Sequence, residues 1–538
     1  MTNEKKSKYF DMLVVGAGFA GLYQLYRAKE RGLTVRVLEA GDGVGGTWFW
    51  NRYPGARCDV ESLDYSYSFS KELEQEWVWT ERYAPQSEIL RYINHVADRF
   101  NLRSDIQLNT RVVSCVFNDL SSTWLLTTVS GDVLEAKYLV MATGGLSVPQ
   151  KPNLKNLASF TGKWYHSAEW PAEGVDFKGK RVALIGTGSS GVQMVPIIAE
   201  QAKQLTVFQR TANFSVPAQN EPLTSEMLAS AKAHYAERRA LGREAVSGQY
   251  LSANPKSALE VNEEERNAEL EHRWKSAGGG FRMLRAFSDM MVDLRANRYV
   301  GDFARSKIRE IVKDPRKAAI LCPKDDLPFG TKRLCVDTNY YETFNRDNVD
   351  IVDVSATPLE EATTSGLRTT EREYEFDAIV FATGFDAMTG ALKAIDIKGS
   401  GGITLRDKWA DGPLAYLGVA IAGFPNMFCI TGPGSPSVLT NVIHSIETHV
   451  DWIMNLLSHA EEKKAQRIEA TVGAEENWVT HVSDLASSTL YPMAKSWYNG
   501  SNIEGKPRVF MAYVAGVPAY RKVIEEIAAE SYKGFALS

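Results

Sequence analysis

The stretch DMLVVGAGFAGLYQLYRAKERGLTVRVLE, residues 11–39, decides the fold of the N-terminal part of this chain. An apolar run ends in the turn GAGFAG, and good helix formers follow over residues 22–31. A second apolar run then ends at an acid, Glu39. This order of strand, G-x-G-x-x-G turn, helix, strand and acid predicts a dinucleotide-binding unit, with a pyrophosphate at the helix N-terminus and ribose hydroxyls on the acid. The predicted contacts are Gly16, Gly18, Phe19, Gly21 and Glu39.

A second turn of the same kind, GTGSSG, spans residues 186–191 and again follows an apolar run. The next apolar run ends in Gln209-Arg210-Thr211, where an NAD-binding unit would place an acid. Without the acid a 2′-phosphate is not repelled, and Arg210 can bind it through two hydrogen bonds, although a solvated arginine at a strand end is the alternative. The predicted contacts are Thr187, Gly188, Ser189, Ser190, Gly191, Gln193, Arg210 and Thr211.

Residues 45–59 read GGTWFWNRYPGARCD and indicate which dinucleotide binds first. An extended flavin dinucleotide needs a second glycine-rich loop, and the dense aromatic residues suit packing against a ring system. Gly, Pro and Asn also make ordinary surface turns, which is the competing interpretation. One unit ending in Glu and one ending in Arg predicts FAD and NADPH as cofactors, with Gly46, Thr47 and Trp48 among the FAD contacts.

The amino-acid composition argues against several classes of protein. The chain has 538 residues, with 61 Lys and Arg against 66 Asp and Glu, a net charge of −5. That balance predicts no nucleic-acid or membrane partner, and no apolar run approaches the ~20 residues that a spanning helix needs. Five scattered cysteines without a C-x-x-C pair predict a cytoplasmic protein without disulfides or a metal site. We expect a monomer or a weak homo-oligomer.

The predicted fold class is α/β, with two Rossmann-like dinucleotide-binding domains and a helical insertion in the NADP domain. In the last part of the chain we expect strands over residues 415–420 and 427–430 and a helix over 440–457. The predicted divisions are an FAD domain (8–145), a linker and first NADP segment (146–217), the insertion (218–330), a second NADP segment (331–385) and a second FAD segment (386–538).

Between the two turns, residues 160–171 read F-x-G-x-x-x-H-x-x-x-W-P. This string resembles the fingerprint of the type I Baeyer–Villiger monooxygenases, and the chain is closest in pattern to the phenylacetone and cyclohexanone monooxygenases of that family. The resemblance runs from Leu13 to Gly534 and includes A-T-G-F-D at residues 382–386. It implies that NADPH reduces FAD, that O₂ then forms a C4a-peroxyflavin, and that this attacks a ketone to give an ester or lactone through a Criegee intermediate, with sulfoxidation as a side reaction.

Two alternatives stay open at this point. The first is a heteroatom (N- or S-) oxygenating flavin monooxygenase, which shares both nucleotide turns. The second is an FAD- and NADP-binding protein without catalytic activity.

The resemblance also implies roles for residues outside the turns. It makes Arg333 the active-site arginine, Lys332 a partner of the 2′-phosphate, and Asp59 the residue that orients Arg333; a permanent cation there can stabilise oxyanions. The loop over residues 432–439 would shape the substrate pocket, and Trp497 would close over NADP, with core packing as its alternative. His166 is expected to be structural. Tyr65, Val112 and Val442 complete the expected cofactor contacts.

Overall fold

The computed structural model describes residues 8–276 and 279–538. The first Gly-rich turn belongs to an eight-stranded sheet of order β17-β4-β5-β6-β1-β2-β3, with β18 also paired to β6. The pairs β4–β5 and β5–β6 are antiparallel and the others are parallel. Its strands are β1 (Lys8–Val15), β2 (Val35–Leu38), β3 (Ile106–Gln107), β4 (Val112–Asn118), β5 (Thr123–Thr128), β6 (Val133–Met141), β17 (Asp396–Lys398) and β18 (Met427–Cys429).

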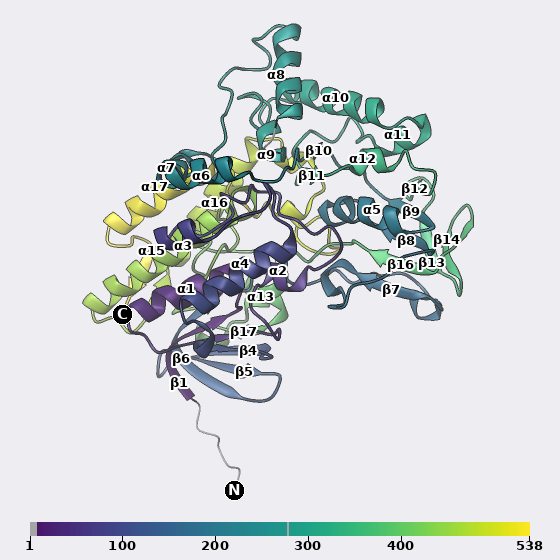
Figure 1. Ribbon diagram of the computed structural model, residues 1–538. Coiled ribbons are helices and arrows are strands. Elements are labelled where there is room, and N and C mark those ends of the chain that lie inside the picture. The colour runs from purple at the N-terminus through teal and green to yellow at the C-terminus, as the bar shows by residue number, and fades with distance from the viewer. Residues whose placement is uncertain (1–7, 277–278) are drawn as a thin grey trace.

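The second turn belongs to a five-stranded, wholly parallel sheet of order β12-β9-β8-β16-β7. Figure 1 shows it to the right of the first sheet, with α5 (Ser189–Gln201) above it. Its strands are β7 (Lys163–His166), β8 (Arg181–Ile185), β9 (Gln204–Gln209), β12 (Val349–Asp353) and β16 (Ala378–Phe381). The fold class predicted from the sequence is confirmed.

The two turns are built alike. α1 (Phe19–Glu30) follows the first turn and packs against α15 (Val442–Glu462), while α5 follows the second. Gly16 has φ +106°, and a Cβ there would lie 2.6 Å from the Ala142 carbonyl oxygen at the end of β6. Gly186 has φ +111°, and its Cβ would lie 2.4 Å from the Ala382 carbonyl oxygen at the end of β16. Glycine at the first motif position therefore lets each turn close onto the neighbouring strand.

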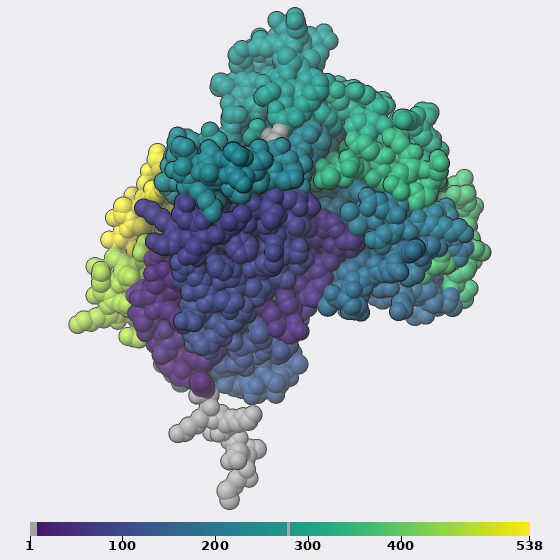
Figure 2. Space-filling model, viewed as in Figure 1, coloured from purple at the N-terminus to yellow at the C-terminus, as the bar shows by residue number. Residues whose placement is uncertain are grey.

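A helical insertion separates β10 (Ser215–Pro217) from its parallel partner β11 (Cys335–Asp337). It forms the top of the molecule in Figure 1, and Figure 2 shows its surface over the purple N-terminal part. The sequence of the insertion contains a glycine run at residues 278–280, whose first residue, Gly278, lies outside the described residues. Its helices are α6 (Ser225–Ala233), α7 (Tyr235–Glu244), α8 (Glu263–Lys275), α9 (Gly279–Met283), α10 (Leu294–Ile311) and α11 (Pro315–Leu321).

The remaining elements cover the sheets. The helices are α2 (Thr47–Trp50), α3 (Lys71–Glu76), α4 (Gln86–Arg99), α12 (Tyr340–Thr343), α13 (Gly390–Ala394), α14 (Leu405–Lys408), α16 (Val472–Ser487) and α17 (Gly516–Ala529). The strands are β13 (Leu359–Ala362), β14 (Gly366–Thr369), β15 (Glu373–Glu375), β19 (Ile468–Ala470) and β20 (Phe535–Leu537). None of the helices described in residues 8–276 and 279–538 is long and apolar enough to span a bilayer.

One expected strand is wrong. Residues 415–420 form a tight turn, in which the Tyr416 N–H donates to the Ala420 carbonyl oxygen over 2.7 Å. Leu417 and Gly418 have φ values of 57° and 70°, in the left-handed region that strands do not use. The apolar side chains are buried because the turn lies inside the core, and burial without alternation resembles a buried strand in sequence.

Candidate active site

A single cavity of about 1670 Å³ reaches both Gly-rich turns. It is lined by every predicted site residue except Gly21 and Gly191. Those from the first unit and its loop are Gly16, Gly18, Phe19, Glu39, Gly46, Thr47, Trp48, Asp59, Tyr65, Val112 and Val442. Those from the second unit and the facing loops are Thr187, Gly188, Ser189, Ser190, Gln193, Arg210, Thr211, Lys332, Arg333 and Trp497. The two sequence motifs therefore face one continuous space.

The third glycine of each motif has a packing role instead. A Cβ on Gly21 would lie 1.8 Å from the Gly16 carbonyl oxygen, and one on Gly191 would lie 2.1 Å from that of Gly186. Real Cβ atoms never approach backbone so closely. These glycines let α1 and α5 pack tightly against their own turns, so the cavity does not reach them.

The first turn is held by its acid. Glu39 is only 4% exposed, and its carboxylate accepts the Ala17 N–H at 2.7 Å and the Gly41 N–H at 2.8 Å. Gly46 lies across from the turn with φ +53°, and a Cβ there would come within 2.9 Å of the Gly18 Cα. The two backbones therefore meet without side chains between them, and both glycines line the cavity, which suits the close approach of a pyrophosphate. The residues present fit an FAD molecule.

The loop after this turn joins the two units. The Trp48 indole N–H donates to the Tyr65 hydroxyl at 3.1 Å, which fixes two of the aromatic rings that line the cavity. Further along, the Tyr53 hydroxyl donates to the Gln193 side-chain oxygen at 2.8 Å, and the Gln193 amide donates to the Arg57 carbonyl at 2.9 Å. Gln193 lies in α5, so these hydrogen bonds join the loop over residues 45–59 to the second nucleotide unit.

Two cations face the second turn. Lys332 is half-buried and Arg210 is exposed, and both line the cavity. Burial, and then the nearby charge of Arg210, lower the pKa of Lys332. Neither side chain has an acidic partner among the residues that the structure describes. Two neighbouring cations without a carboxylate form a binding site for a doubly charged phosphate, so this unit fits NADP.

Arg333 and Asp59 meet where the two units join. The Arg333 Nε lies 2.8 Å from one oxygen of Asp59 and Nη2 lies 2.7 Å from the other, a two-point ion pair. Nη1 donates to the Val438 carbonyl. Burial alone would lower the pKa of Arg333, but the charge of Asp59 and the Tyr498 hydroxyl raise it above its usual value. The guanidinium is therefore a permanent, fixed cation at 20% exposure.

Two contacts of Arg333 involve residues that our sequence assignments leave out, Phe281 and Tyr498. Its guanidinium carbon lies 4.9 Å from the centre of the Phe281 ring in α9, a cation–π contact from the helical insertion. Val438 belongs to the loop over residues 432–439, which the resemblance does mark. Phe281 and Tyr498 carry no local motif, so only the three-dimensional structure brings them to Arg333.

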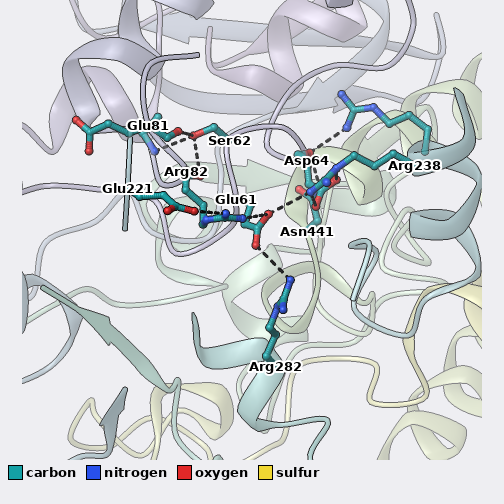
Figure 3. Close-up of polar contacts among 11 residues, drawn as sticks. Glu61, Ser62, Asp64, Glu81, Arg82, Glu221, Arg238, Arg282 and Asn441 are labelled. Atoms are coloured by element: carbon teal, nitrogen blue, oxygen red, sulfur yellow. Dashed lines mark hydrogen bonds and ion pairs between the residues drawn. The ribbon is translucent and has the colours of Figure 1, made fainter. Parts of the chain in front are cut away.

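A network of ion pairs anchors the insertion beside this centre (Figure 3). Glu61, two residues after Asp59, is 7% exposed at its side chain and lies 3.5 Å from Arg82, 3.3 Å from Arg238 and 3.9 Å from Arg282. Arg238 also forms a two-point pair with Asp64. Because Arg238 lies in α7 and Arg282 in α9, Glu61 ties two helices of the insertion to the loop that carries Asp59.

His166 and Trp497 differ in position. His166 is buried outside the cavity; its Nε2 lies 3.0 Å from the Thr383 hydroxyl and its Nδ1 accepts the Ala168 N–H at 3.2 Å. Burial lowers its pKa, so the neutral ring joins the fingerprint to the A-T-G-F-D turn. Trp497 lines the cavity and also packs against the cluster of Ala387, Met388 and Met511. Its position fits both interpretations, and its closure over NADP stays a prediction.

Comparison with known proteins gives consistent matches over the whole chain. The family model described as pyridine nucleotide-disulphide oxidoreductase matches residues 13–297. A Baeyer–Villiger monooxygenase from Pseudooceanicola batsensis is 43% identical, over 97% of this chain and 95% of that protein. The phenazine N-monooxygenase PhzNO1 from Lysobacter antibioticus is also 43% identical, over 98% and 97%.

Solved structures agree with these relatives. An oxidised steroid monooxygenase bound to NADP is 52% identical, with a TM-score of 0.94 over 98% of this chain and 99% of that one. The OTEMO complex with FAD and NADP is 40% identical, with a TM-score of 0.95 over 99% and 100%.

Proposed function

Because this chain belongs to the Baeyer–Villiger monooxygenases, we propose that Arg333, held by Asp59, is the residue on which its ketone oxygenation depends. The enzyme is an FAD-containing, NADPH-dependent monooxygenase that converts a small-molecule ketone into an ester or lactone. When bound, FAD supplies the transfer of electrons from NADPH to O₂ that makes one oxygen atom available for insertion beside a carbonyl.

The observation that carries this proposal is the two-point Arg333–Asp59 pair on the wall of the cavity. Insertion beside a ketone places negative charge on the former carbonyl oxygen. A guanidinium already fixed by Asp59 and Val438 can stabilise that charge without reorganising, and its planar donors remain charged at any physiological pH. Asp59 does not touch this oxygen in the proposal; it positions the guanidinium.

The two cofactors are proposed to lie in separate parts of the cavity. The glycines of the first turn, the Glu39 carboxylate and the Trp48 and Tyr65 rings would hold FAD. Ser189 and Ser190 at the start of α5, with Arg210 and Lys332, would hold NADPH and select it over NADH through its 2′-phosphate.

The arrangement of the strands supports the proposed division into domains. We assign residues 8–145 and 386–538 to the FAD domain, because the strands of the eight-stranded sheet come from these two segments. Residues 146–217 and 331–385 carry the five-stranded sheet, and 218–330 carry the helical insertion. The five cysteines are free and buried, which supports the proposed cytoplasmic location.

N-oxygenation is the second candidate activity, because one relative of equal identity is named as an N-monooxygenase. Arg333 distinguishes the two activities. Attack on a ketone forms a tetrahedral adduct whose former carbonyl oxygen is an alkoxide that needs a partner, whereas oxygen transfer to an amine or sulfur lone pair passes through no such adduct.

The experiment is a panel of ketones, aromatic N-heterocycles and sulfides, incubated with the holoenzyme and NADPH. Products identified by mass spectrometry should be esters or lactones from several ketones. Heterocycle N-oxides without any ester would reverse the order of the two candidates.

A further inference from the structure

Arg285 is a partly buried cation without an acidic partner among the residues that the structure describes. It follows α9, four residues after the Phe281 ring that contacts Arg333. Its side chain forms no hydrogen bond or ion pair with any residue that the structure describes, and burial lowers its pKa. An arginine remains protonated even so, and withdrawing its charge partly from water without a partner is unfavourable unless something binds it.

The side chain of Arg285 lines a small cavity of about 60 Å³ beside the catalytic pair. Asp59 and Arg333 line both this cavity and the large one, so the two spaces adjoin at the reacting centre. Its other walls are mostly apolar or aromatic: Phe281, Leu284, Met291, Leu439, Tyr491 and Tyr498. The space is large enough for a few heavy atoms and has one charged group to receive them.

The surrounding charges do not neutralise Arg285. Asp59 gives both of its oxygens to Arg333. The nearby acids are matched by cations of their own: Glu61 by Arg282, Asp64 by Arg238, Glu81 by Arg57 and Glu221 by Arg82. No acid in the described part of the chain is thus paired with Arg285. Burial raises the pKa of Tyr491 and the charges of Arg285 and Arg333 oppose that rise, so Tyr491 lies near both cations.

From this unpaired arginine in its own cavity we infer that the substrate is a ketone that also carries a carboxylate. The carboxylate would form a two-point ion pair with Arg285, and the Tyr491 hydroxyl can donate a further hydrogen bond. The hydrocarbon between carboxylate and carbonyl would lie against Phe281 and Leu439. This inference rests on the proposed function for the position of the ketone, and it makes Arg285 a specificity-determining residue.

A carboxylate fits better than a larger anion. The cavity is small, and among the residues that line it Arg285 is the one cation without an acidic partner. The proposed 2′-phosphate site, in contrast, has two cations, Arg210 and Lys332, on the wall of the large cavity. A planar carboxylate matches one guanidinium with two parallel hydrogen bonds.

Binding can be tested without turnover. Cyclohexanones with a carboxylate on alkyl arms of increasing length, each paired with its methyl ester, are titrated calorimetrically into oxidised holoenzyme without NADPH. At the best arm length the acid should bind at least about tenfold more tightly than its ester, as expected for a charge-assisted pair. Equal affinities at every arm length would overturn the inference.

Variants then test whether Arg285 is the residue that causes the preference for acid over ester. In Arg285→Met the preference for acid over ester should fall at least about tenfold, and Arg285→Lys should keep part of it because the charge remains. Arg295→Met, which removes an arginine 74% exposed nearby on α10, should leave the preference unchanged. The ester, titrated into the same protein, and the flavin absorbance show whether each variant is folded. A full preference in Arg285→Met would place the carboxylate elsewhere and contradict the inference.

Turnover separates this inference from the proposed function. The same acid-to-ester preference should appear in kcat/KM for oxygenation. If no ketone, charged or neutral, gave an ester while the acid still bound through Arg285, the proposed function would fail and the anion site would stand.

Discussion

The two dinucleotide units share one backbone design and differ in the charge that follows the second strand. In the first unit β2 leads to Glu39, whose carboxylate accepts two backbone N–H groups of its own unit. In the second unit β9 leads to Arg210, which lies near Lys332 without an acidic partner in the described part of the chain. In our proposal the glycines determine where a pyrophosphate can approach, whereas the terminal side chain determines which dinucleotide is accepted.

The largest effect should come where the two units meet. Arg333→Ala should still be reduced by NADPH, because hydride transfer needs only two adjacent rings, but ester formation should fall by roughly 10²–10³-fold. The NADPH that is still consumed should appear as hydrogen peroxide. Stopped-flow spectroscopy measures the reduction of FAD by NADPH, and product analysis measures ester formation. Asp59→Ala should slow both of these steps, but less severely than Arg333→Ala slows ester formation. Ester formation near the wild-type rate in Arg333→Ala would remove Arg333 from its proposed role.

The next effect concerns how the insertion is held against the first unit. Glu61→Gln removes the carboxylate shared by Arg82, Arg238 and Arg282. Arg282 then loses its acidic partner, while Arg82 and Arg238 keep Glu221 and Asp64, so the free energy of unfolding should fall by roughly 3 kcal/mol. Thermal denaturation of the holoenzyme followed by circular dichroism gives the change. Glu30→Gln is the matched control, since Glu30 is 46% exposed and surface pairs contribute only about 0–1 kcal/mol. Equal melting temperatures for both variants would show that the network does not stabilise the fold.

The affinity of the first unit for FAD should depend on Glu39. Glu39→Gln keeps the shape of the side chain but removes the charge that accepts the Ala17 and Gly41 N–H groups and, in the proposal, the ribose hydroxyls. Charge-assisted hydrogen bonds contribute about 1.5–3 kcal/mol, so the affinity for FAD should fall by about 10- to 100-fold. Fluorescence titration of the apoprotein with FAD measures this. Unchanged affinity would mean that Glu39 serves only its own turn.

The sequence predicts features that form within one short segment, but it does not predict contacts between segments far apart in the chain. Both turns and the strands and helices beside them are confirmed, because each motif lies within one strand–turn–helix unit. The predicted site residues line the cavity except Gly21 and Gly191, and their roles stay predictions. The Phe281 contact and the Glu61 network join segments far apart in the chain and carry no periodic pattern. The turn at residues 415–420 is misread because a buried turn and a buried strand have the same apolar composition.

The comparison between the two units is tested most directly by the ratio of kcat/KM for NADPH to kcat/KM for NADH. Wild-type enzyme should strongly prefer NADPH, and Arg210→Ala combined with Lys332→Ala should reduce the preference at least about tenfold, with little change in the use of NADH. The reason is that both cations are proposed to contact only the 2′-phosphate, which NADH lacks. A double variant that kept the wild-type preference would show that the 2′-phosphate binds elsewhere, and would contradict the assignment of the second unit by its terminal charge.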